Sequence, residues 1–395
     1  YADDRVLQPQ VKEDGLWKTV SWDEAITLAA AKLRAAADSH GGGQLAALMS
    51  PSAATEEYFL AQSLLRQLGS DNIDHRLRDG DFSDDPARPL SPAFSLPLAE
   101  ISSCDAVLLI GCNPRQEAPI VGHRIRQAWR GGAQVSVVNP LDWPFTFDTS
   151  LDAIVAPQQM VQELASLAAA VEKATGTTAP DHLRGLLGQV EVDARQQALA
   201  ERLQGSGRSL CLLGQFAMAH PQAAALRALA RYVADATGGA CNLLMHGGNA
   251  TGAWLAGAVP HRGPGGSKTA GGANAQQMLD SAHPAYLLWG IEPEYDCGNP
   301  AAAMQVLEQA EAVIAVASFA TDSLRQVADL ILPLAPHAEG EGSLMNFDGT
   351  TQAFAPAAKA QGEARPGWKI LRRLGGALGL SGFEQVGLAD VQSDL

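Results

Sequence analysis

Short, continuous apolar runs alternate along the chain with longer segments in which apolar residues recur every three or four positions. Runs such as AVLLIG at 106–111 have the length of buried strands, and the longer segments have a helical period. The order strand, helix, strand occurs four times, and each time it predicts one β-α-β unit. The predicted elements are 45–50, 55–68 and 72–75; 105–111, 119–129 and 134–140; 209–214, 221–237 and 241–244; and 285–290, 300–309 and 312–317.

This alternation predicts doubly wound α/β domains, because continuous apolar strands between helices are typical of parallel sheets covered on both faces. A further helix is expected before the first unit. Ser21 and Glu24 have capping-box spacing there, at the start of an amphipathic run that ends near Ala37. Segment 158–204 predicts additional helices. Segment 246–273 is a long Gly-rich connection, which in a compact domain is usually functional or disordered.

The length and charge of the chain narrow the classes of function. With 395 residues it exceeds the size at which a single hydrophobic core stops growing, so two or more domains are expected. A formal net charge of −15 argues against binding to nucleic acid or to an anionic membrane surface, since both attract basic patches. The apolar runs are far shorter than the ~20 residues needed to cross a bilayer, so no membrane insertion is expected.

The cysteines are scattered, and no C-x-x-C pair occurs among them. This pattern indicates a reducing compartment and offers no ligand framework for zinc or an iron–sulfur cluster within these residues. Residue 1 is Tyr rather than Met, so we expect a fragment or a processed form of a longer protein. The five cysteines are at positions 104, 112, 211, 241 and 297.

The stretch DHRLRDGDFSDD at 74–85 places five aspartates and three basic residues directly after a predicted strand. A calcium loop needs acidic or polar ligands at alternate positions and glycine at position 6. Counted from Asp79, position 6 is Asp84, so the calcium interpretation fails. The alternative is a hydrogen-bonded loop in which Arg76 and Arg78 neutralise neighbouring aspartates.

Two Gly-rich loops resemble phosphate-binding motifs in composition but differ from them in spacing. In GPGGSKT at 263–269, the two glycines that a P-loop requires fall on Arg262 and Ser267. GGNATG at 247–252 follows a strand but lacks the G-x-G-x-x-G spacing. An unrelated nucleotide-binding α/β protein is therefore kept as an alternative, with these loops as its site. The chain contains no H-E-x-x-H or G-x-S-x-G motif, and no catalytic constellation is predicted.

Two long motifs carry a family resemblance. The first is DAVLLIGCNPRQEAPIVGHRIRQAWRGGAQVSVVNP at 105–140, and the second is ADLILPLAPHAEGEGSLMNFDGTTQAF at 328–354, which GEARPGWKILRRLGGALG follows at 362–379. Together with the opening segment at 5–26, they resemble the molybdopterin oxidoreductase family, which includes formate dehydrogenases and periplasmic nitrate reductases. The resemblance covers nearly the whole chain and implies domains like those of formate dehydrogenase and DMSO reductase.

Within this family, NIDHRLRDGDFSDD at 72–85 and GCNPRQEAPI at 111–120 are most similar to one branch. Its members belong to bacterial NADH–quinone oxidoreductases, or respiratory complex I, and are the counterparts of the mitochondrial 75 kDa subunit. That resemblance implies a non-catalytic scaffold in the peripheral arm, where FMN and iron–sulfur clusters held elsewhere carry electrons from NADH to quinone. It implies iron–sulfur clusters in an upstream segment and other complex I peripheral-arm subunits as partners. It also implies a place on the cytoplasmic face of the bacterial inner membrane.

The resemblance further indicates where a molybdenum cofactor would bind. The metal-ligand loop of the family falls on or near Asp79–Ser83, and no cysteine lies within twenty residues of it, although the metal favours thiolate or selenolate. In the second G-x-N-P-like turn, WGIEP at 289–293, Glu replaces Asn. We therefore expect no bound cofactor and no metal ligand in this chain. The residues at the family's site positions are expected to be vestigial: Asp79, Gly80, Asp81, Ser83, Asn113, Pro114, Glu292 and Asn346.

One alternative within the family stays open, because Ser83 or a carboxylate is an oxygen ligand of the kind that some relatives use. The chain would then be an active molybdenum oxidoreductase of the formate dehydrogenase type, with molybdopterin guanine dinucleotide as cofactor. The family's discontinuous domain order predicts one α/β lobe from 1–76 plus 283–381. It predicts an inserted α/β lobe from 77–282 and a C-terminal tail from 382–395, with the family's terminal β-barrel absent or reduced.

Overall fold

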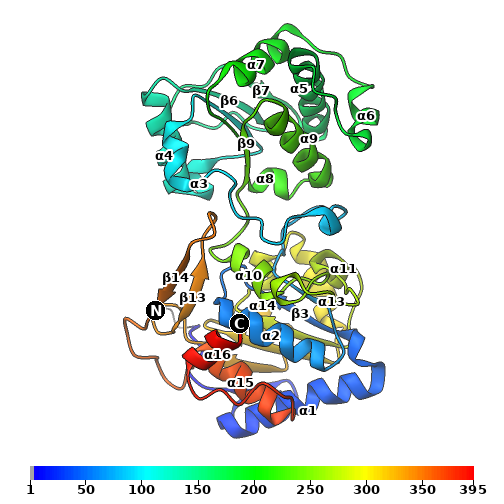
Figure 1. Ribbon diagram of the computed structural model, residues 1–395. Coiled ribbons are helices and arrows are strands. Elements are labelled where there is room, and N and C mark those ends of the chain that lie inside the picture. Colours follow the sequence, from blue (N-terminus) through cyan, green and yellow to red (C-terminus); the bar gives the residue numbers. More distant parts are fainter. Residues whose placement is uncertain (1–3) are drawn as a thin grey trace. The chain divides into compact units, whose positions relative to one another are not determined.

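Four parallel β-α-β units recur along the chain in the computed structural model, which describes residues 4–395 (Figure 1). In each unit two strands pair in parallel across one helix, as predicted. The bounds differ from the predicted ones by about two residues at most, which is the usual uncertainty at element ends. The units are β3 (Leu45–Met49), α2 (Thr55–Gln67) and β4 (Ile73–Asp74); β5 (Ala106–Ile110), α4 (Pro119–Arg130) and β6 (Gln134–Asn139); β8 (Ser209–Leu213), α9 (Ala223–Ala236) and β9 (Ala240–Leu243); and β10 (Ala285–Trp289), α13 (Pro300–Glu308) and β11 (Ala312–Ala317).

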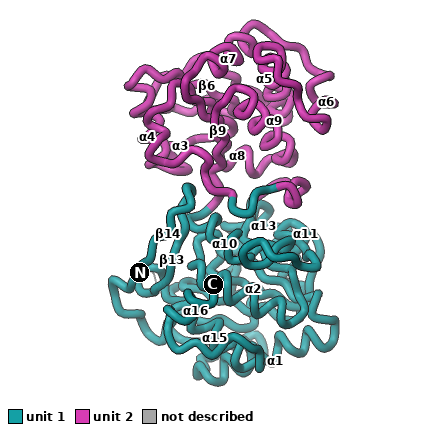
Figure 2. Tube along the Cα trace, in the orientation of Figure 1, with its two compact units in different colours: residues 1–78, 88–91, 247–395 teal, residues 79–87, 92–246 magenta. Residues whose placement is uncertain are grey.

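The chain divides into two compact units, coloured separately in Figure 2. Unit 1 comprises residues 1–78, 88–91 and 247–395, and unit 2 comprises residues 79–87 and 92–246. The predicted doubly wound α/β class holds for both. The predicted lobe boundaries differ from this division because four segments predicted outside the discontinuous lobe belong to unit 1: 77–78, 88–91, 247–282 and 382–395.

Segment 247–282 is held in unit 1 by a buried amide. Asn249 donates from Nδ2 to the carbonyl of Ala53 at 2.7 Å, and its Oδ1 accepts the N–H of Met345 at 2.7 Å. One side chain thus joins three sequence-distant parts of unit 1, a contact that local pattern does not reveal. The Gly-rich connection therefore contains ordered elements: α10 (Ala250–Ala256), a 3-10 helix (Pro264–Gly266) and α11 (Ala275–Asp280).

The predicted C-terminal tail also packs on unit 1. Phe383 is 3% exposed and Val391 is fully buried, so burial of apolar surface attaches the tail to the core. The tail ends in α16 (Leu388–Asp394), whose neighbour in the chain is α15 (Gly367–Ala377).

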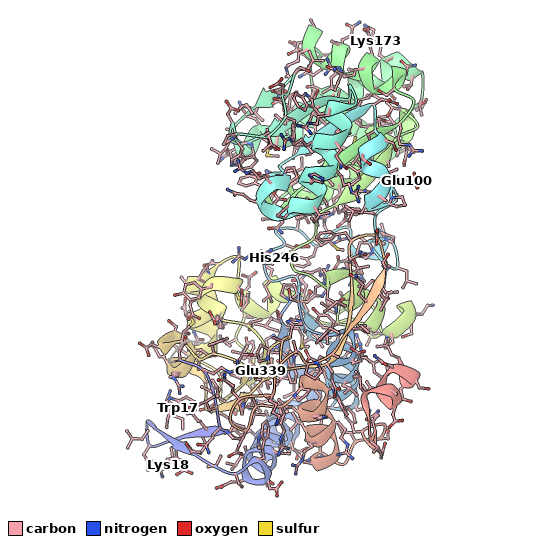
Figure 3. All side chains as sticks on the ribbon, turned by 90° about the vertical axis from the view of Figure 1, so that its left-hand side faces the viewer. Trp17, Lys18, Glu100, Lys173, His246 and Glu339 are labelled. Atoms are coloured by element: carbon pink, nitrogen blue, oxygen red, sulfur yellow. The ribbon has the colours of Figure 1, made fainter. Side chains whose placement is uncertain are left out.

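The sheet of unit 1 has seven strands in the order β2-β1-β12-β11-β10-β3-β4. The five strands from β12 to β4 are parallel, whereas β1 pairs antiparallel with β12 and with β2. β2, which carries Trp17 and Lys18, forms one edge of the sheet (Figure 3). The additional strands are β1 (Gln10–Glu13), β2 (Leu16–Thr19) and β12 (Leu330–Pro333).

Helices cover both faces of this sheet. One core joins the alternate strand residues Ala47, Leu287 and Ile314 to apolar side chains of α1 (Trp22–His40), α2 and α15. On the other face of β10, Tyr286 donates from its hydroxyl to the carbonyl of Met278 in α11 at 2.8 Å. The predicted first helix is confirmed, and Ser21 accepts the N–H of Glu24 as its N-cap. Other elements of unit 1 are α12 (Pro293–Asp296), α14 (Asp322–Val327), and the hairpin of β13 (Gly342–Met345) and β14 (Thr351–Phe354).

The sheet of unit 2 has five parallel strands in the order β7-β6-β5-β8-β9. Its main core joins β5, β6 and β8 to α5, α7 and α9, so the predicted extra helices of 158–204 complete one face of the sheet. The remaining elements are α3 (Pro114–Glu117), β7 (Ala153–Ile154), α5 (Met160–Thr175), α6 (Asp181–Leu187), α7 (Ala194–Gly205) and α8 (Gln215–Met218).

The two sheets share one strand order. From β7 to β9, unit 2 matches unit 1 from β12 to β4, with β5 in the place of β10 and β8 in the place of β3. Equivalent hydrogen bonds follow: Gly214 donates to the carbonyl of Ile110 at 3.0 Å, and Ser50 donates to that of Trp289 at 2.7 Å. In each unit the chain order reverses between this central pair of strands. Parallel sheets of this kind bind ligands at that topological switch point, beside the carboxyl ends of the strands.

Candidate functional site

The switch point of unit 2 lies where β5 and β8 end. After β5 the chain turns through Gly111, whose φ of +52° favours glycine, and then enters α3 at Pro114. A Cβ on Gly111 would lie 2.6 Å from the backbone nitrogen of Ala217, so the turn packs directly on α8. The predicted N-P turn at Asn113 and Pro114 is therefore present at the carboxyl edge of the sheet.

Glu117 closes this turn from within the protein. Its Oε1 accepts the N–H of Asn113 at 2.6 Å, and its Oε2 accepts the N–H of Gln215, the residue that begins α8, at 2.7 Å. Burial raises the pKa of Glu117, while the two backbone hydrogen bonds lower it. A second side chain, Asn139, accepts the N–H of Cys112 at 2.9 Å. The N–H groups of Cys112, Asn113 and Gln215 are thus bonded to side chains of unit 2.

The switch point of unit 1 retains a cavity of about 240 Å³. It lies at the carboxyl ends of β3, β10, β11 and β12, the position at which a doubly wound sheet binds a ligand. Its lining combines aromatic rings, hydroxyl groups and carboxylates. The aromatic, hydroxyl, imidazole and carboxylate side chains of this lining include those of Ser50, Glu57, Trp289, Glu292, Phe319, His337, Glu341 and Phe354.

Glu57 is fixed at the base of this cavity. Its Oε2 accepts the N–H of Ala54 at 3.2 Å and the indole N–H of Trp289 at 3.1 Å, and a Cβ on Gly367 would lie 2.0 Å from its Oε1. Burial raises the pKa of Glu57 to about 7, with a smaller contribution from the neighbouring carboxylate of Glu56. Glu57 can therefore change charge near neutral pH.

Glu292 lines the same cavity at the second predicted turn. Gly290, with φ of +65°, precedes it, and Asp296 accepts the N–H of Glu292 through Oδ2 at 2.7 Å. Burial raises the pKa of Glu292, and the carboxylates of Asp296 and Glu294 raise it further. The cavity is thus acidic, which disfavours an anionic ligand.

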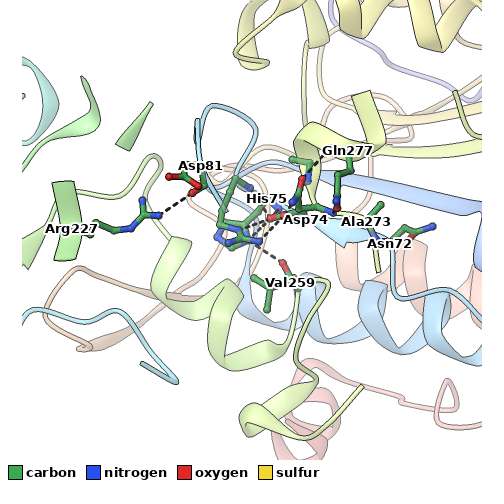
Figure 4. Close-up of polar contacts among 12 residues, drawn as sticks. Asn72, Asp74, His75, Asp81, Arg227, Val259, Ala273 and Gln277 are labelled. Atoms are coloured by element: carbon green, nitrogen blue, oxygen red, sulfur yellow. Dashed lines mark hydrogen bonds and ion pairs between the residues drawn. The ribbon is translucent and has the colours of Figure 1, made fainter. Parts of the chain in front are cut away.

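The aspartate-rich stretch divides at the boundary of the units. In unit 1, Asp74 is fully buried and forms an ion pair with Arg76 at 2.8 Å (Figure 4). Asp74 also accepts the N–H of His75 at 2.8 Å and that of Ala275 at 3.1 Å. Although burial opposes ionisation, the Arg76 guanidinium lowers the pKa of Asp74. The predicted role of Arg76 is confirmed, whereas Arg78 donates to the backbone carbonyls of residues 295 and 296.

The second half of the stretch is tied to α9 in unit 2. Asp81 accepts the N–H and the hydroxyl of Ser83 at 3.0 and 2.7 Å, and the N–H of Ala224 at 2.9 Å. Arg227 is 6% exposed and donates to both carboxylate oxygens of Asp84, at 2.8 and 2.5 Å. It also donates to the carbonyl of Asp81, as Figure 4 shows. The loop is therefore a structural element with its own cation, and local spacing does not reveal Arg227.

The remaining candidate residues, Gly80, Asn346 and Asp79, lie outside the helices and strands. Gly80 donates to the carbonyl of Met218 at 3.0 Å, and a Cβ there would lie 2.3 Å from the carbonyl oxygen of Ala219. In unit 2, α8 thus contacts both the loop of Gly80 and the turn of Gly111. Asn346 accepts the N–H of Thr350 at 3.0 Å in the β13–β14 turn. Asp79 lies at the first residue of unit 2.

The donor set offers no metal site within residues 4–395. No group of three or more His, Cys, Asp or Glu side chains there could hold a metal ion. All five cysteines are buried and free, and burial raises the pKa of Cys112, the one nearest the first turn, well above its usual value. Burial thus keeps this thiol protonated, whereas a metal requires the thiolate.

The Gly-rich loops considered as phosphate sites are closed on themselves or on unit 1. In the loop 263–269, Gly263 donates to the carbonyl of Ser267 at 2.8 Å and Gly266 donates to that of Gly263 at 3.0 Å. In the other loop, a Cβ on Gly247 would lie 2.5 Å from Pro51. These contacts give both loops a structural role. Across the part of the chain that the structure describes, no helix is long and apolar enough to span a bilayer.

The family profile described as molybdopterin oxidoreductase matches residues 5–377. The mitochondrial NADH-ubiquinone oxidoreductase 78 kDa subunit of Neurospora crassa is 25% identical over 388 residues, which cover 95% of this chain and 44% of that protein. The NADH-ubiquinone oxidoreductase 75 kDa subunit of Reclinomonas americana is 23% identical over 394 residues, covering 94% and 49%. The chain thus spans about half the length of these relatives.

Solved structures support the fold. Acetylene hydratase from Pelobacter acetylenicus aligns with a TM-score of 0.70 at 16% identity, covering 97% of this chain and 62% of that one. A chain of the formyltransferase/hydrolase complex from Methylorubrum extorquens aligns with a TM-score of 0.66 at 16% identity, covering 94% and 98%. At these identities the likeness concerns the fold alone.

Proposed function

This chain belongs to the molybdopterin oxidoreductase family, and we propose that it is part of a bacterial counterpart of the 75 kDa subunit, in the peripheral arm of a respiratory NADH–quinone oxidoreductase. The named relatives, which are subunits of NADH-ubiquinone oxidoreductases, support this assignment. In the proposed assembly the chain is a scaffold at the cytoplasmic face of the bacterial inner membrane. Flavin and iron–sulfur clusters held elsewhere transfer the electrons, and the clusters of this component lie upstream of residue 1.

The observation that carries the scaffold proposal is the state of the loop at Asp79–Ser83. It contains no thiolate, and its carboxylate at Asp81 already accepts three hydrogen bonds from Ser83 and Ala224. Recruiting the Asp81 carboxylate to a metal would leave these donors without their acceptor. The loop is therefore built to be stable without a metal.

The residues also do not fit the nucleotide ends of a molybdopterin guanine dinucleotide. Phosphates bind to free backbone N–H groups or to basic side chains. In unit 2 the N–H groups of Asn113 and Gln215 are bonded to Glu117. In unit 1 the cavity is lined by Glu57 and Glu292. Each switch point thus presents carboxylates where a phosphate needs donors, and no reaction step through this cofactor follows from the structure.

The scaffold role is tested by purifying the chain, with whatever assembles with it, from molybdate-replete cells of its source. We expect molybdenum and tungsten below about 0.05 per chain by mass spectrometry, and co-purification of other NADH–quinone oxidoreductase subunits. Near-stoichiometric molybdenum or tungsten would overturn the scaffold proposal in favour of a formate dehydrogenase type of enzyme. A metal-free chain that never co-purifies with those subunits would overturn the assembly proposal.

A further inference from the structure

The turns after β5 and β10 share a sequence spacing that extends from the glycine and proline of the turn to a final acidic residue. GCNPRQE at 111–117 and GIEPEYD at 290–296 both read Gly, two residues, Pro, two residues, acid. In each, the glycine has positive φ and donates to the fifth residue of the next strand, Gly111 to Val138 at 2.9 Å and Gly290 to Val316 at 2.8 Å. Each proline begins a four-residue helix. The two turns are therefore equivalent in local structure as well as in sheet position.

The final acid of each turn accepts the N–H of the residue before the proline. Glu117 accepts from Asn113 at 2.6 Å, and Asp296 accepts from Glu292 at 2.7 Å. A local helix cap would account for these two bonds alone. In unit 2, however, Glu117 also crosses the switch point and accepts the N–H of Gln215 at 2.7 Å. That second bond joins the ends of two neighbouring strands, which a local cap does not do.

The final acid is Glu in one turn and Asp in the other because only one of the neighbouring strands is followed by an N–H group that can donate to it. Gln215 comes second after β8, and the equivalent position after β3 is Pro51, which has no N–H to donate. The shorter Asp296 therefore needs to reach only its own turn. The glycine before Gln215 makes room for the longer side chain, because a Cβ on Gly214 would lie 2.6 Å from Oε2 of Glu117.

We propose that Glu117 and Asp296 are internal ligands, which bind the backbone N–H groups of the two switch-point turns in place of an anion supplied by a bound molecule. Oriented N–H groups at the carboxyl edge of a parallel sheet attract phosphate or carboxylate. Here the attraction is satisfied within the chain, with two bonds in unit 2 and one in unit 1. Each turn is thereby closed to anionic ligands, and the sheet edge is stable without them.

This inference deepens the cofactor-free part of the proposed function and rests on it. The test concerns the folding and anion binding of this chain, so it can fail while the assembly proposal stands. The variant Glu117→Ala leaves two backbone donors without an acceptor. We expect its melting temperature to fall by about 5 °C. Inorganic pyrophosphate or acetate, titrated at constant ionic strength, is expected to restore more than half of that loss by binding the exposed donors.

Three control measurements separate the loss of these hydrogen bonds from a general effect of substitution or of pyrophosphate. Glu191→Ala removes an exposed glutamate of unit 2 and is expected to melt within about 1 °C of the unsubstituted chain. Asp296→Ala is expected to lose less than Glu117→Ala, because one hydrogen bond is removed instead of two. Neither the unsubstituted chain nor Glu191→Ala is expected to be stabilised by pyrophosphate. Equal stability of Glu117→Ala and Glu191→Ala, or equal stabilisation of all forms by pyrophosphate, would overturn the proposal.

If Glu117→Ala does not fold, Glu117→Gln provides the same test, because its single carbonyl oxygen can serve only one of the two donors. Hydrogen exchange at the amides of Asn113 and Gln215 is then compared with exchange in the unsubstituted chain. At least one of the two amides is expected to exchange about tenfold faster. Unchanged exchange at both would show that Glu117 is not their ligand.

Discussion

At the scale of single residues, Glu57 makes the stability of unit 1 depend on pH. Its pKa of about 7 lies above the ordinary value of 4.5, because burial disfavours the charged form. Between these two values the folded chain therefore binds more protons at this site than the unfolded chain. The contribution of Glu57 to the free energy of unfolding is largest below about pH 4.5 and is lost as the pH rises to about 7.

The substitution Glu57→Gln is expected to remove this part of the pH dependence. Urea unfolding at several pH values between 4.5 and 8 measures it, as the difference between variant and unsubstituted chain. That difference should favour the variant progressively as the pH rises. Glu384→Gln, which changes an exposed glutamate of unit 1, provides the control and should follow the unsubstituted chain. Parallel curves for Glu57→Gln and the unsubstituted chain would contradict the raised pKa.

The pairing of side chains was predictable only where the partners are neighbours in sequence. Arg76 was expected to neutralise an adjacent aspartate, and it pairs with Asp74. Arg227 pairs with Asp84 across 143 positions, and no local spacing reveals such a contact. Glu117 was read only as part of a family motif, although its distance from Asn113 could have suggested the bond within the turn. Its second bond, to Gln215, depends on the order of strands in the sheet.

At the scale of elements, the turn after β8 depends on a glycine. A Cβ on Gly214 would lie 2.4 Å from the Cα of Cys112 and 2.6 Å from Oε2 of Glu117. Because the first of these atoms is backbone, Gly214→Ala is expected to destabilise the chain by about 1–3 kcal/mol, as overpacking does. Gly185→Ala, in α6 with no atom near its added Cβ, is expected to be stabilising by about 0.5–1 kcal/mol. Urea unfolding of both variants checks this, and equal stabilities would contradict it.

The elements of the four β-α-β units were predictable because hydrophobic period decides them, whereas sheet strands such as β1, β2 and β12 were not predicted. All eight strands and four helices of the β-α-β units were placed correctly to about two residues. The short helices α3 and α12 were missed, since four residues are too few to show a period. α10 was missed for another reason: its seven residues contain glycine, and its position depends on the bonds that Asn249 makes to distant segments.

At the scale of the whole molecule, the strands of unit 2 form one continuous stretch of the chain. Residues 79–246 contain its complete sheet, its core and the loop that pairs with Arg227. This segment is expected to fold alone and to unfold cooperatively in urea. The same segment carrying Asp84→Ala should be less stable by about 3 kcal/mol, because the loop still covers Arg227 while its carboxylate partner is lost. Equal stability of the two forms would contradict a structural role for the loop.

The division into units was only partly predictable. The first boundary was expected at residue 76 and lies at 78. The second was expected at 282 from the family's domain order and lies at 246, because the buried side chain of Asn249 hydrogen-bonds segment 247–282 to unit 1. The family resemblance thus located the insertion but could not show which unit its last segment joins.

The insertion of unit 2 between β4 and β10 has a consequence for synthesis on the ribosome. In the sheet of unit 1, β3 lies between β4 and β10, so the fully buried run LAALM has only one neighbouring strand until β10 is made. At 5–20 residues per second, the interval between these strands lasts roughly ten to forty seconds. Unit 2 can complete its sheet within that interval. The nascent N-terminal segment, with its apolar strand and helices exposed, is therefore the part of the chain most in need of a chaperone.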